Sequence, residues 1–133
     1  SLSLVRATLE STTDGILVVD NQAKMVDFNQ KFLEIARIPL ELLASGDEQK
    51  ALGFILSQVV EPEELLHQLT SLPPEAKGEL SETLFKDGRI VERYSQPQVI
   101  DGKIVGRVWS FRDVTEKRKA EQELILRNRA VEA

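Results

Sequence analysis

The sequence predicts an α+β fold, with a five-stranded antiparallel sheet, helices on one face of that sheet and flanking helices at the two ends of the chain. Two observations carry this prediction. Segments with β patterning occur on both sides of residues 40–72, whose apolar residues recur at helical spacing. Asp-Gly pairs at 87–88 and 101–102 separate three of the β segments, as in two successive hairpins. A sheet whose strands are divided by a helical insert is typical of the α+β class.

The first half of the chain is predicted to begin with a hairpin. ILVVD (16–20) and MVDF (25–28) are short and apolar, and the polar NQAK between them favours a turn. A helix is expected over residues 30–37, because the side-chain oxygen of Asn29 can cap its first turn. Further short helices are expected over residues 40–44, 47–60 and 62–72.

Three strands and a helix are predicted for the second half. The helix begins after the last strand and continues to the final residue, and either Asp113 or Thr115 can cap its first turn. The three strands are expected over residues 79–85, 90–99 and 104–111. The predicted division is an N-terminal helix over residues 1–13, a core domain over 14–113, and a linker helix over 114–133 that leads to a following domain.

Composition excludes several classes of function. The chain has 133 residues, 41% hydrophobic and 29% charged, which suits one globular domain with a core. The absence of cysteine excludes disulfides, thiol nucleophiles and thiolate metal sites. A net charge of −5 argues against nucleic acid as a partner. No apolar run approaches the roughly 18 residues of a membrane span, so we expect no membrane contact by these residues and a cytoplasmic location, even for a membrane-anchored parent protein.

No motif for catalysis or metal binding occurs. HExxH, GxSxG and Walker patterns are missing, and neither Asp-Gly turn is accompanied by an activating base or metal ligands. His67 is the only histidine. At about 100° per residue it lies roughly 160–200° from Leu65 and Leu69, which belong to the apolar stripe of its helix. We therefore expect His67 to face solvent, and we expect neither a metal site nor an enzymatic activity.

Several of these segments together resemble a PAS domain, from about residue 4 to about residue 125. The likeness rests on DGILVVDNQAKMVDFNQKF near the start and DGKIVGRVWSFRDVTEKRKAEQEL near the end. Its most specific parts are Asp20, Asn29, Gly106 and the Asp113-Val114-Thr115 triplet. The resemblance implies helices that enclose a pocket on one face of the sheet, and a role in receiving or relaying signals.

The resemblance also implies roles for individual residues. Asp113 and Thr115 would connect the last strand to the output helix and relay the signal. Trp109 shares a strand face with Arg107 and Phe111, and alignment on the triplet suggests that this face points into the pocket; outward packing of Trp109 under the N-terminal helix is the alternative. The implied pocket residues are Leu17, Val19, Phe32, Ile35, Trp109 and Phe111.

The expected function is that of a non-catalytic sensory or signal-relay module in a multidomain signal-transduction protein, either a sensor histidine kinase or a cyclic-dinucleotide enzyme. It would sense a small ligand or relay a signal through dimeric helices. The alternatives are a haem- or flavin-bearing sensor and a purely structural dimerisation module. Neither cofactor is expected, because His67 faces away from the pocket, no cysteine can form a flavin adduct, and an inward Trp109 would occupy much of the cavity.

The two terminal helices predict the partners. Both carry apolar stripes, and the stripe of the last helix has the 4-3-4 spacing of a coiled coil. Residues 1–11 resemble residues 123–133, at an offset expected for a neighbouring domain of the same kind. We therefore expect a homodimer through the flanking helices, with adjacent PAS and output domains in the same chain. The stripe residues are Leu2, Val5 and Leu9 in the first helix, and Ala120, Leu124 and Val131 in the last, where Arg127 occupies the remaining position of the 4-3-4 pattern.

Overall fold

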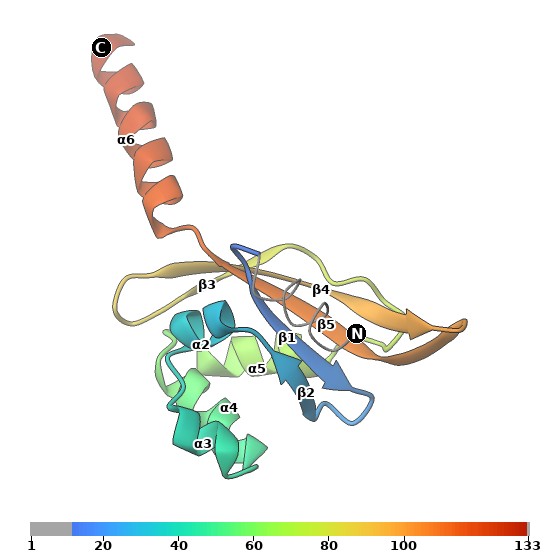
Figure 1. Ribbon diagram of the computed structural model, residues 1–133. Coiled ribbons are helices and arrows are strands. Elements are labelled where there is room, and N and C mark those ends of the chain that lie inside the picture. The colour runs from blue at the N-terminus through green and yellow to red at the C-terminus, as the bar shows by residue number, and fades with distance from the viewer. Residues whose placement is uncertain (1–11, 133) are drawn as a thin grey trace.

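The computed structural model describes residues 12–132 and has the expected α+β architecture (Figure 1). Within these residues a five-stranded antiparallel sheet carries helices on one face, and a last helix extends away from the domain. Leu2, Val5 and Leu9 of the predicted N-terminal helix lie outside the described residues. The elements are β1 (Gly15–Asp20), β2 (Met25–Phe28), α2 (Gln30–Ala36), α3 (Leu40–Ala44), α4 (Glu48–Ser57), α5 (Pro62–Thr70), β3 (Ser81–Leu84), β4 (Ile90–Ile100), β5 (Lys103–Asp113) and α6 (Thr115–Glu132).

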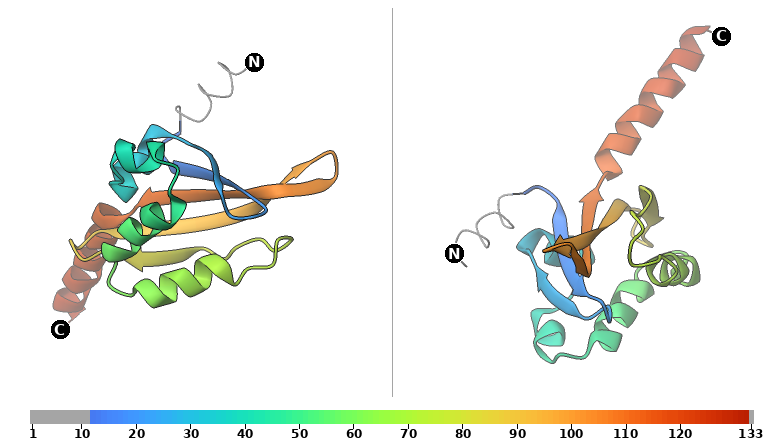
Figure 2. Two further views of the ribbon diagram at one scale, coloured as in Figure 1. Left: turned by 90° about the horizontal axis from the view of Figure 1, so that it is seen from below. Right: turned by 90° about the vertical axis from the view of Figure 1, so that its right-hand side faces the viewer.

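The strand order is β2-β1-β5-β4-β3, so β1 and β5 lie side by side although they are far apart in the sequence (Figure 2). Leu17 of β1 is paired with Trp109 of β5, and Val19 is paired with Arg107. The hairpin of β4 and β5 extends beyond the other strands (Figure 1). β3 pairs only with the first residues of β4, up to Arg93, and within residues 12–132 no other strand pairs with that edge.

Both predicted Asp-Gly turns close hairpins. Asp101 and Gly102 have φ angles of 51° and 76°, and two successive positive φ angles are the requirement of a type I′ turn. At the turn between β3 and β4 the φ angle of Gly88 is 95°. The prediction of two successive hairpins is therefore confirmed.

α2 lies directly on β1. A Cβ atom added at Gly15 would lie 2.9 Å from the Cα atom of Phe32, so this approach requires glycine. Asn29 is buried, and its Oδ1 accepts from the backbone amides of Phe32 at 2.9 Å and Ile16 at 2.8 Å. The predicted N-cap is thus confirmed, and the same side chain also connects the helix to the strand.

The helix predicted over residues 47–60 is shorter in the structure and ends at Ser57. The residues after it pair with the chain that follows β3: the Lys86 amide donates to the Gln58 carbonyl at 2.8 Å, and Val59 forms a bridge with Phe85. Val59 is fully buried. This pairing between distant segments satisfies the backbone and outweighs the local helical spacing.

The core lies between the sheet and the helices. One cluster joins both layers, and a smaller one, of Phe32, Ala36 and Ile38, surrounds α2. Because Ile35 belongs to the first cluster, α2 contributes to both. The residues of the first cluster are Ile35, Val59, Leu65, Phe85 and Val91.

Candidate functional site

A cavity of about 1060 Å³ lies between the sheet and the helices. Small-molecule pockets typically have volumes of roughly 300–1,000 Å³. The sheet side of the cavity is formed by β1, β4 and β5, and the helical side by α2, α4 and α5. The structure brings together along this cavity all six residues implied as pocket residues: Leu17, Val19, Phe32, Ile35, Trp109 and Phe111.

Aromatic side chains form a continuous part of the cavity wall. The rings of Trp109 and Phe111 are stacked, with centroids 6.3 Å apart, and the ring of Phe32 lies 5.6 Å from that of Phe111. The cavity that Trp109 lines has a volume of about 1060 Å³, so the indole does not fill it. Volume is therefore no argument against a bulky cofactor, and the expectation that none is bound stays a prediction.

The apolar stripe of α5 lines the cavity, and the histidine of this helix faces away from the cavity. Leu65 and Leu69 line the cavity, whereas His67 is exposed and does not. Within the described part of the chain, no three His, Cys, Asp or Glu side chains come close enough to hold a metal ion.

None of the helices between residues 12 and 132 combines the length and apolar character needed to cross a membrane.

One end of the cavity is acidic. Asp20, Asp47 and Glu48 line it near the β1–β2 turn and the start of α4, together with Lys24. Each carboxylate accepts from a backbone amide: Asp47 from that of Lys50 at 3.1 Å, Glu48 from that of Met25 at 2.8 Å, and Asp20 from that of Lys24 at 3.0 Å. These bonds fix the carboxylates in place at this end.

Arg107 on β5 holds a loop against the sheet. Its Nε donates to Ser95 Oγ at 2.9 Å, its Nη1 donates to the Pro74 carbonyl at 3.3 Å, and its Nη2 donates to the Ala76 carbonyl. The Gly78 amide adds a bond of 2.8 Å to the Ser95 carbonyl. The guanidinium of Arg107 lines the cavity, but three of its N–H groups already have protein acceptors.

Arg93 on β4 also lines the cavity but has fewer partners. Its side chain is 6% exposed, and its Nε donates to Thr83 Oγ1 at 3.2 Å. Among residues 12–132, no side chain or carbonyl accepts from its two Nη groups, and no carboxylate lies within 4.0 Å. Burial lowers the pKa of Arg93, and the more distant charge of Glu64 opposes this. Arg93 is therefore a buried cation that contacts no counter-ion among the described residues.

The junction of β5 and α6 is closely bonded. Asp113 Oδ1 accepts from the Thr115 amide at 3.0 Å and from the Thr115 hydroxyl. Thr115 Oγ1 in turn accepts from the Ile90 amide at 2.9 Å, and the Val114 amide donates to the Ile90 carbonyl at 2.9 Å. Val114 is buried. The structure thus places Asp113 and Thr115 in contact with each other and with the start of β4.

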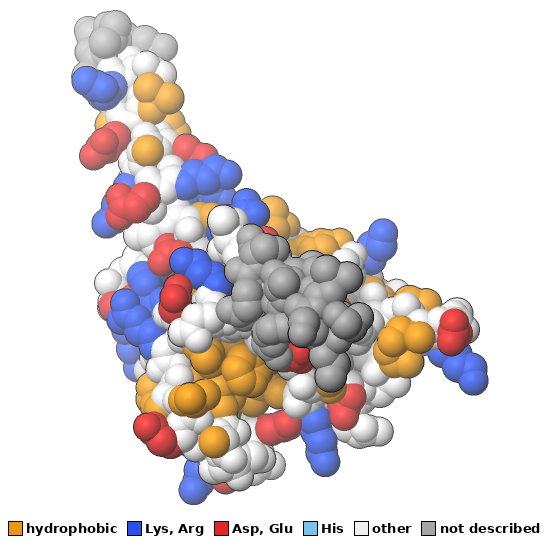
Figure 3. All heavy atoms as spheres, in the orientation of Figure 1, with side chains coloured by type: hydrophobic (Ala, Val, Ile, Leu, Met, Phe, Trp, Pro, Cys, Tyr) orange, Lys and Arg blue, Asp and Glu red, His pale blue; other side chains and the backbone are white. Residues whose placement is uncertain are grey.

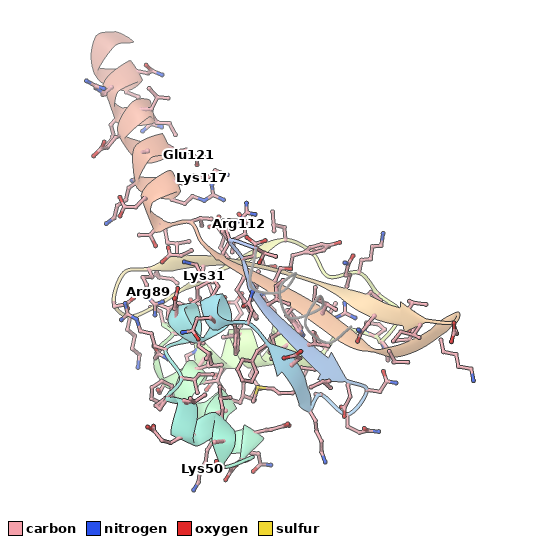
Figure 4. All side chains as sticks on the ribbon, in the orientation of Figure 1. Lys31, Lys50, Arg89, Arg112, Lys117 and Glu121 are labelled. Atoms are coloured by element: carbon pink, nitrogen blue, oxygen red, sulfur yellow. The ribbon has the colours of Figure 1, made fainter. Side chains whose placement is uncertain are left out.

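An arginine on the first turns of α6 connects the helix to the sheet. Arg118 forms ion pairs with Glu82 of β3, with Glu92 of β4 at 3.6 Å and with Glu121 of its own helix at 3.0 Å. Arg112 lies at the base of α6 (Figure 4). It forms an ion pair of 2.8 Å with Asp14. Arg112 and Arg118 are therefore both paired with carboxylates at this junction.

Arg93 and Arg118 are absent from the predictions made from the sequence. For Arg93 the sequence contains a weak indication of its position, because Val91, Arg93 and Ser95 alternate along one strand and therefore share a face. For Arg118 the sequence contains no indication of its ion pairs, since Glu82 and Glu92 are far from it in the sequence and the pairing depends on the fold.

Comparison with known proteins agrees with this geometry. Residues 9–122 match the profile of a protein family described as the PAS fold. A probable C4-dicarboxylate sensor kinase of Bacillus subtilis (strain 168) is 25% identical over 118 residues, which are 89% of this chain and only 20% of that protein. The PAS domain of Bordetella pertussis BvgS superimposes with a TM-score of 0.63 at 15% identity, covering 97% of both chains. A domain of a putative light and redox sensing histidine kinase from Haloarcula marismortui has a TM-score of 0.56 at 19% identity, covering 85% of this chain and 99% of that domain.

Proposed function

The chain belongs to the PAS fold family, and from this premise we propose that it is a non-catalytic sensory and relay module of a larger signal-transduction protein. A small molecule binds in the cavity, and its effect passes to α6. One observation carries the proposal: a single strand, β5, contributes both to the cavity wall and to the start of α6. Trp109 and Phe111 line the cavity, and Asp113, two residues further along, bonds to Thr115.

The bonds at the junction support mechanical coupling. Val114 is buried and bonded to Ile90, so a displacement of β5 relative to β4 has to change the Val114–Ile90 and Thr115–Ile90 bonds. Arg118 ties the next turn of α6 to β3 and β4. A ligand that binds one arrangement of these contacts better than another would shift their population and with it the direction of α6.

The parent protein we propose is a sensor histidine kinase. The similarity to a probable C4-dicarboxylate sensor kinase favours a kinase over a cyclic-dinucleotide enzyme as the output. The dicarboxylate in that name describes the Bacillus subtilis protein, of which only 20% is matched.

α6 supports a parallel homodimer in the parent protein. Leu124, Ile125 and Leu126 are 59%, 52% and 56% exposed, and Figure 3 shows such hydrophobic side chains among charged ones along this helix. At about 100° per residue, three successive apolar residues cover an arc of roughly 200°. This arc is wider than the apolar seam that one coiled-coil partner covers. It therefore suits a helix that packs against a second copy and also leads into a following domain.

Hydrogen exchange tests the coupling through β5. Phe111→Ala perturbs the cavity from β5, whereas Leu17→Ala perturbs it from β1. We expect the first substitution to speed exchange of the Val114 and Arg118 amides about tenfold more than the second, because only β5 continues into α6. Equal acceleration by both variants would show that β5 is not the route and would overturn the proposed relay.

A further inference from the structure

The buried cation of the cavity wall indicates a class of ligand. We propose that the cavity binds a small monocarboxylate with an apolar body, whose carboxylate is held by Arg93. This inference rests on the proposed ligand-sensing function and makes it more specific. It depends on three features: a guanidinium that has no carboxylate partner among the described residues, the apolar lining, and the acidic residues at one end of the cavity.

The guanidinium of Arg93 has the donors that a carboxylate requires. A buried charge without a partner is destabilising, and the cost falls when a counter-ion with good geometry approaches. The two Nη groups of Arg93 are free of protein acceptors within the described residues, and the side chain lines the cavity. Guanidinium and carboxylate groups match each other in a bidentate arrangement. Arg107 is less suited, since its N–H groups hold the loop that contains Pro74 and Ala76.

The apolar body of the ligand follows from the lining near Arg93. Arg93 is paired across the sheet with Phe111, and Trp109 is the next inward-facing residue of β5. Phe32 and Ile35 of α2 line the same space from the helical side. A ligand whose carboxylate contacts Arg93 therefore meets aromatic and aliphatic side chains along the rest of its length.

The acidic end of the cavity disfavours a second carboxylate. Asp20 is paired with Gly106, five positions along β5 from Phe111, the partner of Arg93. At about 3.3 Å per residue, the pair of Asp20 and Gly106 lies roughly 17 Å along the strand direction from the pair of Arg93 and Phe111. A dicarboxylate held at Arg93 would place its second charge among apolar side chains, towards Asp20 and Glu48, or near Arg107. The first two positions are unfavourable for an anion, and at Arg107 a second carboxylate would compete with the three acceptors that the guanidinium already has.

The fluorescence of Trp109 provides the measurement, because it is the only tryptophan and lies on the cavity wall. The probes are hexanoate, succinate and 1-hexanol, each titrated into the wild type, Arg93→Met and Arg112→Met. Methionine keeps an apolar side chain of similar length at position 93. Arg112→Met is the matched control, since it removes the same charge from an exposed side chain that pairs with Asp14.

We expect hexanoate to change Trp109 emission saturably in the wild type and in Arg112→Met, and to bind Arg93→Met about tenfold or more weakly. Succinate should bind the wild type more weakly than hexanoate, and the binding of 1-hexanol should not depend on Arg93. Equal binding of hexanoate to the wild type and Arg93→Met would overturn the inference, and so would tighter binding of succinate. If 1-hexanol binds and hexanoate does not, the inference fails although a ligand cavity remains. If no probe binds, the inference also fails, and the hydrogen-exchange test of β5 still decides the relay separately.

Discussion

At the base of α6, Arg118 is 32% exposed and has three carboxylates within ion-pair distance, whereas on the cavity wall Arg93 is 6% exposed and contacts none of the described carboxylates. The first arrangement fixes a helix to a sheet at little desolvation cost. The second leaves a charge on the wall of a cavity, with no described carboxylate within 4.0 Å. The difference separates a cation used for structure from one whose partner is not supplied by residues 12–132.

Arg107 makes the comparison stricter, because it lines the same cavity as Arg93 and yet has three protein acceptors. If location alone decided the role, substitution of Arg93 and of Arg107 would change the free energy of unfolding in the same direction. If the protein acceptors of each guanidinium decide it, the two changes in the free energy of unfolding should have opposite signs.

The largest effect is expected for Arg107→Met. The substitution removes three hydrogen bonds that hold the loop of Pro74 and Ala76 on the sheet, and it leaves the buried Ser95 hydroxyl without its donor. We expect the free energy of unfolding to fall by about 2 kcal/mol, measured by urea denaturation. An unchanged midpoint would mean that the loop is held by other contacts and that Arg107 resembles Arg93 after all.

Arg93→Met should have the opposite sign. Replacing a buried, uncompensated charge by an apolar side chain of similar length is expected to raise the free energy of unfolding of the ligand-free protein by about 1 kcal/mol. The same urea titration measures it, with Arg112→Met as the control for loss of one positive charge. A clear loss of stability would indicate that Arg93 has a structural partner, which would remove the contrast with Arg107.

Asp113→Ala tests the junction side of the comparison. Burial by itself would raise the pKa of Asp113, but hydrogen bonds from the Thr115 hydroxyl and amide lower it. The positive charges of Arg89 and Lys31 act in the same direction as these bonds, so the net pKa is below the ordinary value. We expect a loss of about 1 kcal/mol at pH 7, because Asp113 no longer accepts from the Thr115 amide and hydroxyl.

The pH dependence of that loss has a defined sign. Because the folded pKa is lowered, Asp113 stabilises the fold above its unfolded pKa of about 3.9, and this contribution disappears as the pH falls through the folded value. The difference between wild type and Asp113→Ala should therefore shrink on going from pH 7 to pH 3 in thermal unfolding. A difference that stays constant with pH would exclude the ionised carboxylate as its source.

The smallest effect is expected for Arg118→Met. Its ion pairs are partly exposed, and such pairs contribute at most about 1 kcal/mol in total and weaken with salt. We expect a loss of about 0.5 kcal/mol in low salt that disappears in high salt, measured by thermal unfolding. A loss that persists in high salt would mean that the stem of Arg118 stabilises the junction by packing.

The strands, their hairpin turns and the Asn29 cap could be predicted because each depends on local chemistry: alternation, an Asp-Gly pair, or an amide oxygen before a helix. The early end of α4 could not, since the pairing of Gln58 and Val59 with the chain after β3 depends on residues about 27 positions away. Trp109 illustrates a partial success. Strand alternation placed it on the face of Phe111, but only the packed structure shows how much space remains beside it.

The role of Arg93 was beyond sequence reasoning for a similar reason. Alternation with Val91 and Ser95 puts it on the inner face of β4, but whether a described carboxylate pairs with it depends on where the carboxylates of other elements lie. Glu64 influences its pKa from α5 and yet remains too far away for an ion pair. Such an arrangement can be recognised only when the elements have been assembled.

The short pairing of β3 with β4 has a consequence for self-association. Beyond Arg93, no strand within residues 12–132 pairs with the outer edge of β4, and such an edge can accept a strand from another molecule, which is the first step of edge-to-edge aggregation. The Ser95 carbonyl faces this edge and is already bonded to Gly78. Pro97, two residues further along, faces the same way and has no N–H to donate. The open edge therefore lacks a donor near its middle, which protects a long, partly apolar hairpin from recruiting a second copy by strand addition.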